Sequence, residues 1–166
     1  MKVIIGAADR KYTYSAKLIV DIVNKLSSHF DVCGHYEIAV NFNSSHTVRK
    51  LNARHRNIDK ATDVLSFPIE EAGGVKKRGF KPEMPLLLGD IFLCPDYILK
   101  NNVIKSGSSL CFETAYLLIH GFMHLIGYDH PKDGYYGSKM CADAEKFIEL
   151  QIRPMNISSL IKVKGR

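Results

Sequence analysis

Residues 118–130 read LIHGFMHLIGYDH, and the rest of the chain is organised around them. His120 and His124 are four residues apart, which places both imidazoles on one face of an α-helix, one turn above the other. Gly127 can adopt the left-handed conformation that ends a helix, so the chain can turn back and bring His130 to the same point. Three histidines that leave one position for water are typical of a catalytic zinc site. The segment therefore predicts one metal ion per chain, bound by these histidines. Zinc suits three imidazoles best, and nickel, copper or cobalt can occupy the same geometry.

The same histidine spacing occurs in metzincin peptidases, where a glutamate general base follows the first histidine. Here that position is Gly121, which carries no proton, so a peptidase mechanism lacks its base. Glycine inside a helix costs about 1 kcal/mol relative to alanine. Its presence indicates that something approaches the helix closely at this point, and a substrate backbone or a packed neighbouring element would both fit.

The composition indicates a single domain covering residues 1–166. With 46% hydrophobic residues in 166, the chain can form one full core but not two comfortable ones. The four cysteines lack C-x-x-C spacing, and we expect them to be reduced and mostly buried. No stretch reaches the roughly eighteen apolar residues that span a bilayer, and no secretory segment is visible. We therefore expect a cytoplasmic protein without a membrane partner.

Hydrophobic periodicity predicts an α+β fold with a mixed four-stranded sheet and about five helices. Strands are expected at 1–6, 36–43, 62–68 and 86–94. Helices are expected at 15–30, from Ser44 or Ser45 onward, at 95–102, from Ser108 or Ser109 through the two histidines, and at 137–151. The helix with the histidines is apolar on nearly every side, which is typical of a central buried helix. Residues 70–85 break all periodicity and predict a loop.

A formal net charge of +6 suits a polyanionic partner without proving one. Three segments concentrate the positive charge: Arg49, Lys50, Arg54 and Arg56 in the first, Lys76, Lys77, Arg78 and Lys81 in the second, and a tail without acidic residues from Ile152 onward. A solvated surface is the alternative interpretation of each cluster. Lys77 and Arg78 are candidates for steering RNA.

Two further blocks precede the histidines. Residues 62–68 read TDVLSFP, and Gly89-Asp90-Ile91 follows in a predicted strand. Together with the histidine segment, and in this order, they resemble the YbeY family of endoribonucleases. The resemblance implies a zinc-dependent, single-strand-specific endoribonuclease that matures the 3′ end of 16S ribosomal RNA and acts in ribosome quality control. It also implies the small ribosomal subunit and one of its proteins as partners.

By the same resemblance, His120, His124 and His130 are the metal ligands, and Arg56 matches a functionally important arginine. The chemistry is consistent with this assignment. Zinc bound by three histidines lowers the pKa of its water toward about 7, so a hydroxide is available without a glutamate base, or zinc acts as a Lewis acid. The guanidinium of Arg56 can neutralise charge on the phosphate. We therefore expect His120 and Arg56 to be catalytic, with substrate binding by Arg56, Lys77 and Arg78.

Several polar residues near the blocks keep two interpretations. Asp63, Ser66 and Asp90 either orient a histidine or position water, or they cap strand ends. Asp129 is expected to fix the turn that delivers His130. Tyr128 is expected in the core, unless its exposure indicates a base-stacking surface.

Two other functional classes compete with the endoribonuclease. One is a ribosome-associated RNA-binding factor whose zinc is mainly structural, and the basic clusters would serve it equally well. The other is a metallopeptidase, which Gly121 disfavours.

Overall fold

The computed structural model describes residues 1–32, 34–69, 86–101, 108–131 and 134–165. Four strands form a mixed sheet in the order β1-β3-β5-β4, and β2 and β6 form a separate two-stranded sheet. The strands are β1 Lys2–Ala8, β2 Tyr12–Tyr14, β3 Tyr36–Phe42, β4 Val64–Pro68, β5 Leu86–Leu93 and β6 Ile161–Val163. In the larger sheet β1, β3 and β5 are parallel, and β4 is the antiparallel edge strand. The predicted mixed four-stranded sheet is confirmed.

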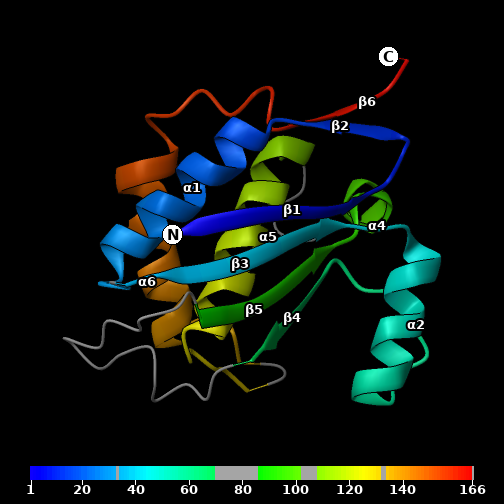
Figure 1. The fold of residues 1–166 in the computed structure, drawn as a ribbon, viewed down its shortest axis with the longest axis horizontal. Helices are drawn as coiled ribbons and strands as arrows, with labels where there is room; N and C mark the ends of the chain where they lie inside the picture. Colours follow the sequence, from blue (N-terminus) through cyan, green and yellow to red (C-terminus); the bar gives the residue numbers. More distant parts are fainter. Residues whose placement is uncertain (33, 70–85, 102–107, 132–133, 166) are drawn as a thin grey trace.

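Five α-helices accompany the sheets in the described part of the chain. They are α1 Ala16–His29, α2 Ser45–Arg56, α4 Pro95–Asn101, α5 Leu110–Leu125 and α6 Lys139–Phe147. Serine side chains cap four of them, and at the two positions left open by the sequence the caps are Ser44 and Ser109. Figure 1 shows α2 beyond the carboxyl end of β3, on the right of the view and below α4, and Val48 of α2 shares a hydrophobic cluster with Tyr97 of α4. The predicted single α+β domain is confirmed.

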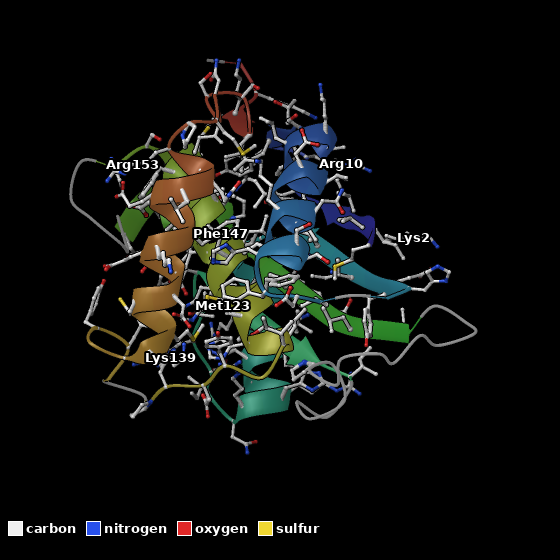
Figure 2. The ribbon with its side chains drawn as sticks, turned by 90° about the vertical axis from the view of Figure 1, so that its left-hand side faces the viewer. Lys2, Arg10, Met123, Lys139, Phe147 and Arg153 are labelled. Atoms are coloured by element: carbon white, nitrogen blue, oxygen red, sulfur yellow. The ribbon has the colours of Figure 1, made fainter. Side chains whose placement is uncertain are left out.

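Helix α5 is the centre of the fold. Twelve of its sixteen residues are buried, as predicted for a central helix. It packs against β4, β5, α1 and α6, and Met123 of α5 and Phe147 of α6 lie within this helical layer (Figure 2). A Cβ atom built on Gly121 would lie 3.0 Å from Cγ2 of Ile91 in β5. Of the two interpretations of this glycine, the packed neighbouring element is therefore the one observed.

Three features differ from the sequence-based expectation. The pairing of β2 with β6 joins the two ends of the chain and was not predicted. The last helix does not continue as an α-helix to residue 151, because a π-helical turn at Ile148–Ile152 follows α6 and Arg153 donates to the carbonyl of Ile148. The first strand extends to Ala8.

The remaining predictions concern cysteines, membranes and the basic loop. Cys94, Cys111 and Cys141 are free and buried, as expected. No helix in the described ranges combines the length and apolar character needed to cross a membrane. The predicted loop at 70–85, with Lys77 and Arg78, lies outside the described residues.

Candidate metal centre

Three histidine side chains converge at the C-terminal end of α5. His120 and His124 lie one turn apart on the helix, and His130 follows the turn after it. One ring nitrogen from each lies within 4.8 Å of the others. The Nε2 atoms of His120 and His124 are 3.1 Å apart, close to the separation of about 3.3 Å between two nitrogen ligands of one tetrahedral zinc ion. The sequence spacing therefore places the three side chains as one candidate ligand set.

The turn that delivers His130 is a hydrogen-bonded helix C-cap. Gly127 has a φ of +88°, its N–H donates to the carbonyl of His124, and the N–H of Tyr128 donates to the carbonyl of Met123. This pair of bonds is the Schellman motif, which requires a left-handed residue where the glycine stands. The Oδ1 atom of Asp129 accepts from the N–H of His130 at 2.8 Å. The carboxylate of Asp129 thus fixes the turn.

Backbone carbonyls select the tautomer of two of the histidines. Nδ1 of His124 lies 3.0 Å from the carbonyl oxygen of Tyr128, and Nδ1 of His130 lies 2.9 Å from that of Pro131. A carbonyl oxygen only accepts, so each Nδ1 carries the proton and each neutral ring presents a lone pair at Nε2. Nε2 of His130 is buried and has no hydrogen-bond partner within the described residues. A buried, unpaired lone pair aimed at two other imidazoles fits a metal ion.

The surroundings also favour the uncharged form of His120 and His124. Burial, followed by the positive charge that His124, His130 and Arg56 would contribute, lowers the pKa of His120 to about 3. Burial likewise lowers the pKa of His124. Metal ligands must be neutral imidazoles, and both shifts favour that form at neutral pH. The electrostatics of His120 and His124 therefore favour the protonation state that a metal ligand needs.

The histidines open into a cavity of about 910 Å³. Arg56, the last residue of α2, lines the same cavity, and its Nη2 atom donates to the carbonyl of Ser66 in β4 at 3.4 Å. The arginine and histidine side chains thus come from three separate segments and meet around one space. A guanidinium beside candidate metal ligands can bind an anionic group such as a phosphate.

The other polar candidates divide between the cavity and the sheet. Asp63 lines the cavity, and its Oδ1 accepts from the Thr62 hydroxyl and from the N–H of Val64, each at 2.8 Å, so this carboxylate also caps the start of β4. Ser66 is buried and lines the cavity. Asp90 lies within β5 opposite Phe67, outside the set of described residues that line the cavity. A direct role of these residues in chemistry stays a prediction.

Sequence reasoning missed an aromatic wall on the cavity. The ring centroid of Tyr135 lies 4.9 Å from that of His120 and 5.0 Å from that of His130. Its hydroxyl is 2.7 Å from that of Tyr116 in α5, and burial raises the pKa of both phenols. The signal in the sequence was the consecutive pair Tyr135-Tyr136, shortly after the third histidine.

Three imidazole ligands leave a coordination position for water, and an open cavity gives a substrate access to it. This arrangement, on a helix buried against a mixed sheet, places the protein in the class of metal-dependent hydrolases.

Comparison with known proteins identifies the family within this class. The family model described as Endoribonuclease YbeY matches residues 7–150. A protein named endoribonuclease YbeY from Limosilactobacillus reuteri is 35% identical over 139 residues, covering 81% of this chain and 82% of that protein. Its namesake from Oenococcus oeni is 33% identical over 134 residues, covering 81% and 84%. The chain belongs to the endoribonuclease YbeY family, so both the resemblance seen in the motifs and the prediction of an enzyme are confirmed.

A solved structure agrees with this assignment. The solution structure of TM1509 from Thermotoga maritima matches the fold with a TM-score of 0.56 and 27% sequence identity, covering 89% of this chain and 87% of that one. The similarity therefore extends over nearly the whole α+β domain.

Proposed function

We propose that the protein cleaves single-stranded RNA at a zinc site formed by His120, His124 and His130, with Arg56 binding the scissile phosphate. The observation that carries the proposal is the convergence of three imidazoles and one guanidinium on a single cavity. Membership of an endoribonuclease family supplies RNA as the substrate class. We propose one zinc ion per chain, because three imidazoles suit zinc and the described part of the chain holds one such ligand cluster.

In this proposal backbone carbonyls would position the histidines, and Arg56 would supply positive charge. The carbonyls of Tyr128 and Pro131 accept hydrogen bonds from Nδ1 of His124 and His130, which leaves the lone pair of each Nε2 to bind the metal. When bound, zinc lowers the pKa of water toward about 7 and polarises a phosphoryl oxygen. The guanidinium of Arg56 neutralises the charge that builds up on the phosphate in the transition state. The absence of a glutamate at Gly121 is then tolerated.

We further propose that the biological substrate is ribosomal RNA, at the 3′ end of the 16S molecule. The small ribosomal subunit and one of its proteins would be the partners, in ribosome quality control and in the cytoplasm. The family motifs support this role, and the net charge of +6 is compatible with it. Lys77 and Arg78 would contribute positive charge to RNA binding.

An RNA-binding factor with a mainly structural zinc is the alternative. Structural zinc sites are usually closed by four protein ligands, most of them cysteine. Within the described residues the cluster holds three histidines, and it faces an open cavity. This geometry favours the hydrolase.

The decisive experiment compares wild type with His124→Ala. Metal content is measured by elemental analysis, and cleavage of a single-stranded ribosomal RNA fragment is followed in the same preparations. We expect about one zinc per chain and cleavage in wild type, with both lost in a variant that keeps its circular dichroism spectrum. Cleavage that persists without zinc would contradict the proposal. Tight RNA binding by a wild-type protein that never cleaves would favour the alternative.

A further inference from the structure

One tyrosine of the cavity wall differs from the others in its exposure to solvent. Tyr116, Tyr128, Tyr135 and Tyr136 all line the cavity. The first and third pair through their hydroxyls, and the hydroxyl of Tyr128 donates to Asp143 at 2.9 Å, while its ring packs on the core. Tyr136 is different, because 72% of its surface is exposed, more than for any other large hydrophobic side chain in the described ranges.

The ring of Tyr136 is tied to the histidines through one intermediate ring. Tyr136 and Tyr135 meet edge to face with centroids 5.5 Å apart. Tyr135 in turn contacts the rings of His120 and His130 and is anchored to α5 by the hydroxyl of Tyr116. The position of Tyr136 relative to the candidate metal ligands is therefore set by packed aromatic contacts.

An exposed aromatic ring in the same cavity as the proposed phosphate-binding arginine is suited to bind a nucleobase. Apolar surface left in water is unfavourable, and scattered exposed rings are common on proteins. This ring lies instead on the wall of a cavity that also holds Arg56. A phosphate bound at the guanidinium and the nucleobase of an adjacent nucleotide would therefore share one cavity. Bases of single strands stack readily on tyrosine rings.

We infer that Tyr136 is the stacking platform of a nucleobase subsite, which binds the unpaired base of a nucleotide next to the scissile phosphate. The inference rests on the proposed function and adds a residue that selects the substrate. A base held in a duplex offers no free face, so the platform would favour single strands. Every base has a π-face, so the preference would depend little on sequence.

The test measures binding rather than turnover. Zinc-loaded wild type, Tyr136→Ala and Tyr136→Phe are titrated with fluorescent 2′-O-methyl hexanucleotides, in which one base at a time is replaced by an abasic site. Gel electrophoresis confirms that the oligonucleotides stay intact. Leu150→Ala is the matched control, because it removes an exposed apolar side chain that is 55% accessible and lies outside the described cavity lining.

We expect Tyr136→Ala to weaken binding about tenfold, with Tyr136→Phe and Leu150→Ala close to wild type. At one position the abasic substitution should cost wild type about the same factor and cost Tyr136→Ala almost nothing, since both changes remove the same stack. A wild-type enzyme that cleaves RNA while Tyr136→Ala retains full affinity, or the full abasic penalty, would overturn the subsite alone. Failure of wild type to bind or cleave single-stranded RNA would overturn the proposed function, and the subsite with it.

Discussion

Helices α5 and α2 contribute to the same cavity in opposite ways. Twelve of the sixteen residues of α5 are buried, and its two histidines are held neutral by their surroundings. In α2 only Val48 and Asn52 are buried, and its first turn has no acidic residue while its last turn holds Arg54, His55 and Arg56. Figure 1 shows α5 behind the sheet and α2 beside it, beyond the carboxyl end of β3.

The proposed roles of the two helices account for the difference. Metal ligands need fixed positions and uncharged nitrogens, and a packed core supplies both. A phosphate needs a full positive charge, which is costly to bury and stays charged where water reaches it. Arg56 would keep its charge in water and still contact a phosphate in the cavity. It is the last residue of the exposed helix, and its side chain reaches the cavity beside β4. The following predictions test this division between buried positioning and exposed charge.

The largest effect is expected on the buried side. His120→Ala should abolish zinc binding and lower RNA cleavage at least about a thousandfold, because the remaining two imidazoles no longer form a three-ligand site. Zinc should raise the thermal unfolding temperature of wild type and leave that of the variant unchanged. Elemental analysis, calorimetry with and without zinc, and a cleavage assay measure the three quantities. Full activity with undetectable metal would refute the assignment.

Packing of α5 against the sheet gives the next prediction. Gly121→Val should lower the free energy of unfolding by about 2 kcal/mol, because its Cβ alone would sit 3.0 Å from Cγ2 of Ile91 and the branched methyls would come closer. Denaturant unfolding of the zinc-free protein measures the loss. The cost should be smaller when Ile91→Ala is already present, since the two side chains compete for one space. Equal costs in both backgrounds would show that the helix shifts instead.

On the exposed side, Arg56→Ala should leave zinc content and stability near wild type. It should lower cleavage about 10- to 100-fold, because a charge-assisted contact to the phosphate is lost. The matched control is Arg54→Ala, which removes the same charge from the same exposed helix but from a side chain outside the described cavity lining. We expect the control to weaken binding only slightly and to lessen its salt dependence. Equal losses from both substitutions would indicate bulk charge rather than a placed guanidinium.

Local signals in the sequence predicted the arrangement of the histidines on and after α5 well. The spacing of His120 and His124 and the glycine at Gly127 act within one helix and its cap, so periodicity and turn chemistry describe them fully. The serine caps and the buried character of α5 are local in the same sense. These features needed no knowledge of the rest of the fold.

Long-range contacts explain what was missed. The strands β2 and β6 are three residues each and pair across the two ends of the chain, so neither shows a usable alternation by itself. The bond of Arg56 to the carbonyl of Ser66 joins a helix to a strand. Tyr135 reaches His120 only because the chain turns back over α5. Such contacts depend on tertiary packing, which periodicity does not encode.

The smallest effect is expected for the exposed ion pair beside α2. Arg49 donates through Nε and Nη2 to the carboxylate of Asp59 at 2.7 and 2.6 Å, and this bond lowers the pKa of Asp59. Because the folded pKa lies below the unfolded value, the pair stabilises the fold above about pH 3.9 and loses its contribution as the pH falls through the folded value. Both groups are solvated, so Asp59→Asn should hardly change the unfolding temperature at pH 7, and any difference should vanish in acid.

The substitution Asp59→Asn also frees the positive charge of Arg49 on α2, so RNA binding at low salt should tighten slightly. Denaturation at pH 7, 5 and 3 and titrations at two salt concentrations measure these effects, with Glu149→Gln in the exposed Arg153–Glu149 pair as the control. A loss of stability as large as that of Gly121→Val would show that α2 relies on this pair, and that its exposed charge is structural after all.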